Sequence, residues 1–152
     1  MAAEELKLLL RDYGPDGTFL KIKNNRDVGK NVEDCIEYAL TLEPRRSMSI
    51  GLKNSDLMIS GGSAFFEDMK YLTGKGGRFG EIYYKKGAWL YHHTLKPTEP
   101  GSSGLVALTD DGVELSENQN IILTAGKSIG FKVRRRRYGE IEETGLVTLI
   151  IA

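Results

Sequence analysis

The chain has 152 residues, of which 40% are hydrophobic and 28% are charged, as expected for one globular domain. Its 21 basic and 21 acidic residues cancel to a formal net charge of zero, which argues against a general polyanion-binding protein. One cysteine excludes an internal disulfide and is typical of a reducing compartment, the acidic N-terminus lacks a secretory pattern, and no apolar run approaches the roughly 18 residues of a membrane helix. We therefore expect a cytoplasmic protein without membrane contact, forming a single domain over residues 1–152.

Helical spacing marks two segments near the N-terminus, residues 2–11 and residues 32–42. Three leucines stand at i, i+3, i+4 in the first, and five apolar residues stand at i, i+3, i+4, i+7, i+8 in the second. A short strand is expected between them, at residues 19–23. The sequence thus predicts a helical N-terminal segment, residues 1–46, packed on a β-domain of residues 47–152.

From residue 47 onward the apolar period shortens from 3.6 to 2. Glycines, 18 of 152 residues, fall between short apolar runs, which indicates many turns. Apart from one or two helical turns at residues 63–72, the rest is expected as strands near 48–52, 57–59, 81–84, 88–93, 105–108, 113–115, 121–123, 128–133 and 146–151. This many short strands predicts a mostly β fold, a β-sandwich, that is α+β by content once the N-terminal helices are added.

Linear motifs for catalysis or cofactor binding are lacking. The glycine-rich segment Thr73–Gly80 has the spacing of neither a P-loop nor a dinucleotide-binding loop. His92 and His93 are neighbours on an expected strand, so their side chains point to opposite faces and cannot hold one metal ion together. Cys35 falls on an apolar stripe and is expected as a small buried hydrophobe. We therefore expect no enzyme, cofactor or metal site, with an enzyme whose site leaves no linear motif as an alternative.

Four consecutive arginines are the sharpest charge feature: Arg134, Arg135, Arg136 and Arg137. They are suited to docking phosphate, nucleic acid or an acidic peptide. However, if Tyr138-Gly139 is a two-residue hairpin loop, three of them face glutamates, as Arg134–Glu143, Arg135–Glu142 and Arg137–Glu140. Such cross-strand pairs contribute roughly 0.2–1 kcal/mol each. We favour this second interpretation, in which the run is largely self-neutralised.

Four segments within residues 48–133 resemble a forkhead-associated (FHA) domain. They are Ser49–Ile59, Gly87–Leu90, Ser102–Gly104 and Ile121–Phe131. The first looks like the opening glycine-arginine segment of the family, the second like its tryptophan-bearing strand, the third like the loop before its next strand, and the fourth like its closing strand, turn and strand. The resemblance implies a β-sandwich that binds phosphothreonine peptides.

The phosphate-binding positions of that family hold other residues in this chain. Leu52 stands in place of the arginine with Lys53 beside it, Gly77–Gly80 in place of a Ser-x-x-His segment, and Ser103-Gly104 in place of Asn-Gly. A dianionic phosphate needs several charge-assisted donors. We therefore expect an FHA-like protein-interaction module or scaffold that is not a standard phosphothreonine binder. Its expected contact residues lie in loops around 53–55, 74–80 and 96–103: Lys53, Asn54, Arg78, Ser102 and Ser103.

Two alternatives follow from other features of the chain. Exposed terminal strands such as residues 146–151 are suited to edge-to-edge pairing, which would make the chain a structural subunit of a homo-oligomer. The run Arg134–Arg137 with Tyr138 is suited to nucleic-acid binding, which we favour less than a protein or peptide partner.

Overall fold

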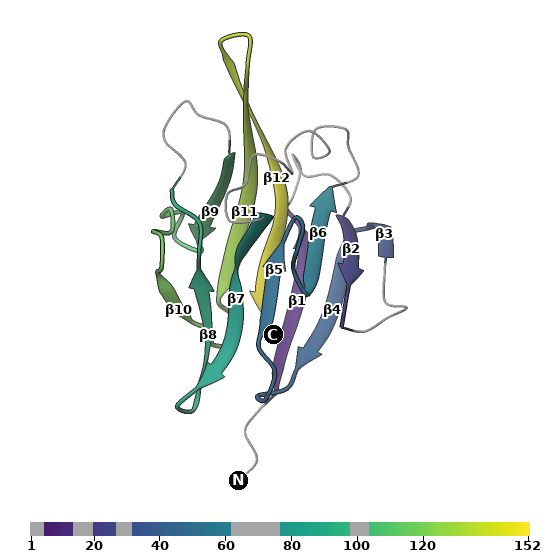
Figure 1. Cartoon of the computed structure of the whole chain (residues 1–152), viewed down its shortest axis with the longest axis vertical. Coiled ribbons are helices and arrows are strands. Elements are labelled where there is room, and N and C mark those ends of the chain that lie inside the picture. The colour runs from purple at the N-terminus through teal and green to yellow at the C-terminus, as the bar shows by residue number, and fades with distance from the viewer. Residues whose placement is uncertain (1–4, 14–19, 27–31, 62–76, 98–103) are drawn as a thin grey trace.

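The computed structural model describes residues 5–13, 20–26, 32–61, 77–97 and 104–152, which form two β-sheets packed face to face (Figure 1). The strands are β1 (Leu6–Asp12), β2 (Leu20–Asn24), β3 (Val32–Cys35), β4 (Glu37–Leu42), β5 (Met48–Gly51), β6 (Leu57–Gly61), β7 (Arg78–Lys85), β8 (Ala88–His93), β9 (Gly104–Thr109), β10 (Asn120–Ile122), β11 (Ser128–Arg137) and β12 (Glu140–Ile151). The five-stranded sheet has the order β4-β1-β12-β11-β9, and the seven-stranded sheet has the order β10-β8-β7-β5-β6-β2-β3. The predicted mostly β fold is confirmed. Among these residues there is no helix that could cross a membrane.

The first predicted helix, residues 2–11, is wrong because the described part of this range forms β1 from Leu6 onward. Leu6, Leu8 and Leu10 are 4%, 2% and 0% exposed, so the buried side chains recur with the period of a strand. The three consecutive leucines at positions 8–10 satisfy both a helical and a strand period, and pairing decides between them. β1 is hydrogen-bonded to β12 on one side and to β4 on the other.

The second predicted helix, residues 32–42, is also wrong, because it divides into β3 and β4. These two strands belong to different sheets, and the chain crosses between the sheets at Ile36, which is 59% exposed. Along β4 the more buried side chains alternate with exposed ones. Cys35 is partly buried against the core, as a small apolar residue would be. The helical turns predicted at residues 63–72 lie outside the described residues.

The N-terminal strands are therefore part of both sheets and do not form a helical segment packed on them. β1 lies inside the five-stranded sheet, and β2 pairs with β6 in the seven-stranded sheet. The strand predicted at residues 19–23 is confirmed as β2. Alternate side chains of β2 are buried because one face of its sheet packs on the core.

Most strands predicted after residue 47 are confirmed. β7 and β8 form a hairpin through Lys86 and Gly87, whose φ angles of 51° and 82° suit a two-residue turn. The strand predicted at residues 113–115 is reduced to a bridge between Glu114 and Leu108. β10 and β11 follow each other in the chain but lie in different sheets, so they do not pair with each other.

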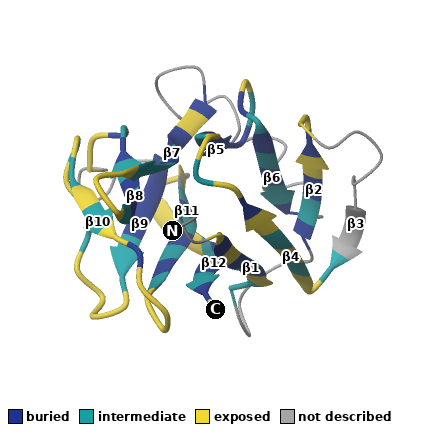
Figure 2. Cartoon of the chain, turned by 90° about the horizontal axis from the view of Figure 1, so that it is seen from below, coloured by how far each residue is buried: buried dark blue, intermediate teal, exposed yellow. Residues whose placement is uncertain are grey.

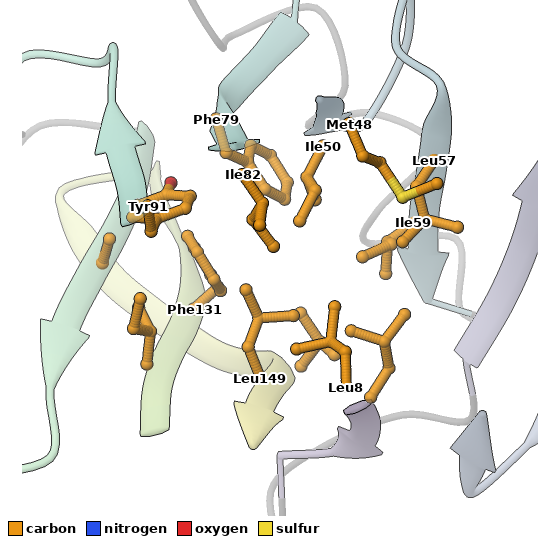
Figure 3. Packing of buried hydrophobic residues seen from close by; sticks show 14 of the residues in the cluster. Leu8, Met48, Ile50, Leu57, Ile59, Phe79, Ile82, Tyr91, Phe131 and Leu149 are labelled. Atoms are coloured by element: carbon orange, nitrogen blue, oxygen red, sulfur yellow. The ribbon is translucent and has the colours of Figure 1, made fainter. Parts of the chain in front are cut away.

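Aromatic side chains join the two sheets at the centre of the core (Figure 3). Phe131 of the five-stranded sheet stacks on Phe79 of the other sheet at a centroid distance of 5.1 Å, and its ring meets Tyr91 edge-on at 6.1 Å. Such pairs add about 0.5–1.5 kcal/mol each beyond the burial of their area. Figure 2 shows that buried positions lie between the sheets and alternate with exposed positions along the strands.

The C-terminal strand is central, and the prediction that residues 146–151 are available for edge pairing is wrong. β12 pairs with β1 through Val147–Ile151 and with β11 through Glu140–Ile150, with an irregularity at Leu146. Its backbone donors and acceptors are therefore used inside the sheet. Within the part of the chain that the structure describes, the sheets end at β4 and β9 and at β10 and β3.

Candidate functional site

The loop between β5 and β6 contains two of the predicted contact residues. β5 and β6 are parallel neighbours, so the chain must turn back within residues 52–55 to begin β6 beside Ile50. Asn54 adopts the left-handed conformation, with φ of 52°, which asparagine tolerates better than most residues. The Leu52 amide donates to the Gly77 carbonyl oxygen at 2.9 Å and so ties this loop to the start of β7.

Lys53, Asn54 and Arg78 lie together, although Arg78 is 24 residues beyond Asn54 in the chain. The Arg78 Nε donates to the backbone oxygen of Asn54 at 2.7 Å. The aliphatic part of Lys53 passes over Gly77, where an added Cβ would lie 2.4 Å from Lys53 Cγ. Gly77 has a φ of +88° and leaves the space that the lysine stem occupies. These three predicted contact residues thus lie side by side, and Asn54 and Arg78 are exposed to solvent.

Asp56 anchors the other end of the loop. Its Oδ2 accepts hydrogen bonds from the Ser49 amide at 3.0 Å, from Ser49 Oγ at 3.2 Å and from Arg26 Nη2 at 3.0 Å. The Asp56 amide in turn donates to Ser49 Oγ at 2.9 Å. Partial burial raises the pKa of Asp56, but the hydrogen bonds from Ser49 and the bond and charge of Arg26 outweigh it and hold the pKa below its usual value.

Residues at the end of β2 brace the same loop and were not found from the sequence. Asn25 Nδ2 donates to the Ser55 carbonyl oxygen at 2.8 Å, and the Asn25 amide donates to the Asp56 carbonyl oxygen at 2.8 Å. Arg26 contributes the ion pair with Asp56. These partners are 30 residues apart in the chain, and no local pattern marks such a contact.

Replacing Asp56 with asparagine is expected to lower the free energy of unfolding by about 2 kcal/mol, since hydrogen bonds to charged groups contribute about 1.5–3 kcal/mol. The lowered pKa of Asp56 means that its contribution is present above pH 4 and is lost as the pH falls further. Urea unfolding at pH 7 measures the loss. The control is Asp111→Asn, an exposed turn residue, and an equal effect of both substitutions would contradict the anchoring role.

Ser102 and Ser103, the other predicted contact residues, lie outside the described residues. The structure describes the chain again from Gly104, which begins β9 and pairs with Arg134.

The three grouped residues Lys53, Asn54 and Arg78 are hereafter called the loop surface.

The arginine run forms a hairpin with the glutamates, in the predicted register. Tyr138 and Gly139 have φ angles of 52° and 79°, as a two-residue turn requires. The register places Arg134 opposite Glu143, Arg135 opposite Glu142, Arg136 opposite Ile141 and Arg137 opposite Glu140. Arg134 Nε and Nη2 each donate to Glu143 Oε1 at 3.3 Å. Figure 1 shows this hairpin continuing beyond the two sheets, and the register favours the self-neutralised interpretation.

The two histidines point to opposite faces of β8, as predicted. His93 is 3% exposed, and its Nδ1 lies 3.0 Å from the Tyr91 hydroxyl oxygen. His92 is on the outer face, where its Nδ1 lies 2.8 Å from Asn120 Oδ1. Within the described residues, no group of three or more His, Cys, Asp or Glu side chains is placed to hold a metal ion.

No family model, curated protein or solved structure matches this chain. The function must therefore be argued from the site.

Proposed function

We propose that this chain is a protein-interaction module that binds its partner through the loop surface of Lys53, Asn54 and Arg78. The observation that supports this most is the 2.7 Å hydrogen bond from Arg78 Nε to the Asn54 oxygen, which holds two exposed polar residues from distant parts of the chain in one place. Exposed loops on a rigid strand framework are common sites of recognition.

The surface is held in place before any partner arrives. Hydrogen bonds from Leu52, Asn25 and the Ser49–Asp56 pair fix the backbone on both sides of Asn54. A loop that is already ordered loses less conformational entropy on binding, so more of the interaction energy appears as affinity.

The chemistry of the surface suits acceptor groups on the partner. Arg78 has five N–H donors, of which Nε is used by Asn54, and Lys53 adds a second cation. Carboxylates and backbone carbonyl oxygens of a protein partner are matching groups. The arginine, serine and histidine of the FHA phosphate site are replaced here, so we propose recognition that does not depend on phosphate.

The single cysteine supports a cytoplasmic location.

Replacing both Lys53 and Arg78 with alanine is expected to reduce partner binding by at least about tenfold, because interface arginines commonly contribute more than 1 kcal/mol. The experiment is affinity capture from a lysate of the source organism with quantitative mass spectrometry. The matched control replaces Lys85 and Lys127, two exposed lysines at the end of β7 and before the start of β11, away from the loop surface.

The expected result is a protein retained by the wild type and the control but lost with Lys53→Ala/Arg78→Ala. Phosphatase treatment of the lysate should leave the capture unchanged. Equal capture by both double variants would refute the loop surface as the binding site, and loss after phosphatase treatment would refute phosphate independence.

The other two candidate functions have weaker support. Homo-oligomer formation through residues 146–151 lacks an available edge, because β12 is paired on both sides. Nucleic-acid binding through the arginine run competes with the glutamates opposite it.

A further inference from the structure

The outer edge of β4 presents a row of backbone groups to its surroundings. The Asp12 amide donates to the Ile36 carbonyl oxygen at 2.7 Å, which makes this a hydrogen-bonded pair of the β1–β4 ladder. Hydrogen-bonded and non-hydrogen-bonded pairs alternate in an antiparallel ladder. The N–H and C=O groups of Glu37, Ala39 and Thr41 consequently point away from β1.

Among the described residues, little of the usual protection against added strands is present at this edge. Natural edges are commonly blocked by proline, lysine, a bulge or a covering loop. β4 contains no proline or lysine, and its outward backbone groups make no backbone hydrogen bond among the described residues. At the opposite edge of the same sheet, by contrast, Thr109 and Leu115 form backbone bonds that cover part of β9.

A groove of about 650 Å³ follows the same edge. It is lined by the consecutive residues Tyr38–Glu43, together with Met48, Asn24, Arg26 and Arg46. Side chains of a strand alternate between its two faces, so a groove beside only one face would be lined by every second residue. Lining by consecutive residues places the groove along the edge, beside the outward N–H and C=O groups.

The groove is suited to an extended peptide with apolar and acidic side chains, because apolar side chains and two arginines line it together with Glu43. Tyr38 and Leu40 are partly buried on its inner side, next to Leu42 and Met48, and can pack against apolar side chains. Arg26 is held by Asp56 at 3.0 Å, whereas the exposed Arg46 lies beyond the end of β4, where it can meet a carboxylate. A row of alternating backbone donors and acceptors is the feature to which an added strand hydrogen-bonds.

We propose that β4 and its groove bind an extended segment of another protein as an added strand of the five-stranded sheet. The segment directs apolar side chains toward Leu40 and Met48 and an acidic side chain toward Arg46. This site uses β4, the end of β2, Arg46 and Met48, and it shares no residue with the loop surface, so each can be tested without the other.

The test begins with a phage-displayed library of random dodecapeptides selected on the full chain. The enriched peptides are synthesised, labelled and titrated by fluorescence anisotropy. We expect alternating apolar residues with at least one Asp or Glu. Selection on Arg46→Glu should enrich peptides that carry Lys or Arg in its place.

Ala39→Pro is the decisive variant, because it removes an outward N–H while leaving the bonds between β4 and β1 intact. Binding of the enriched peptides should weaken at least about tenfold, as expected when a buried hydrogen bond is lost and the added strand is obstructed. Ala125→Pro makes the same change at an exposed position of the turn closed by the Lys127 amide and the Thr124 oxygen, away from the groove. It is the matched control and is expected to bind as the wild type does.

Amide hydrogen exchange on the wild-type protein provides a readout that does not depend on how the proline variant folds. Bound peptide should slow exchange at Glu37, Ala39 and Thr41. The proposal is overturned if no peptide is enriched, if the peptides bind Ala39→Pro as well as Ala125→Pro, or if these amides become protected without peptide as the protein concentration rises. The last result would assign the edge to a second copy of the chain.

Discussion

Replacing Gly51 with alanine is expected to lower the free energy of unfolding by about 3 kcal/mol, at the upper end of the usual cost of overpacking. An added Cβ would lie 2.4 Å from the Gly77 carbonyl oxygen, 2.5 Å from Ser55 Oγ and 2.8 Å from Arg78 Cα. Two of these atoms belong to the backbone and cannot turn aside as a side chain can. The start of β7 would have to move away from β5, and the loop surface would separate.

Urea unfolding with circular dichroism measures the change in stability. The matched control is Gly112→Ala, because Gly112 has a φ of +80° and an added Cβ would meet nothing within 4 Å. This control isolates the conformational cost of alanine at positive φ, about 1 kcal/mol. If Gly51→Ala is no more destabilising than Gly112→Ala, the close approach of β5 and β7 is disproved.

Local patterns predict the parts of this fold that depend on short-range turns. Tyr138-Gly139 is bounded by residues of opposite charge, and this alone was enough to predict the register that pairs Arg134 with Glu143. Lys53, Asn54 and Arg78 are predicted as contact residues from a resemblance between segments, and the structure places them side by side.

The N-terminal strands could not be predicted in the same way, because their structure depends on distant partners. The leucines of β1 fit a helix as well as a strand, and only the pairing with residues 147–151 settles the choice. The helical stripe at residues 32–42 includes Ile36, which is exposed where the chain crosses between sheets. The bracing of the loop surface by Asn25 and Arg26 is likewise a contact across some 30 residues of sequence.

The two proposed surfaces are linked through Asp56. Its carboxylate holds Arg26, which lines the groove beside β4, while its backbone anchors the loop that carries Asn54. Asp56→Asn therefore perturbs both surfaces, whereas Ala39→Pro and Lys53→Ala/Arg78→Ala each alter one. Binding is therefore tested with Ala39→Pro and with Lys53→Ala/Arg78→Ala, and not with Asp56→Asn.

Stability is expected to fall as the pH is lowered from about 6.5 to about 4, because His93 is buried in its neutral form. Burial, with a smaller contribution from the charge of His92, lowers the pKa of His93 to about 4. Burial also raises the pKa of Tyr91, so its hydroxyl stays protonated and can donate to His93 Nδ1 at 3.0 Å. That donation requires the nitrogen to be without a proton.

The direction of this pH dependence follows from proton binding by His93 in the folded and in the unfolded chain. Above pH 6.5 the imidazole is neutral in both the folded and the unfolded chain, so the stability is complete. Between pH 6.5 and 4 the unfolded chain binds a proton that the folded chain does not, and this costs up to about 3 kcal/mol at 1.36 kcal/mol per pH unit. Below pH 4 both states are protonated, and this residue adds no further loss.

Urea unfolding at pH 7, 5.5 and 4 measures how the free energy of unfolding depends on pH. His93→Gln is the matched variant. Glutamine does not titrate but keeps a side-chain acceptor for the Tyr91 hydroxyl. The difference in unfolding free energy between the wild type and His93→Gln should shift by about 3 kcal/mol in favour of the variant between pH 7 and pH 4. Carboxylates titrate alike in both proteins, so they cancel in this difference. Parallel pH profiles would show that His93 is accessible to protons in the folded chain and that β8 does not bury it as described.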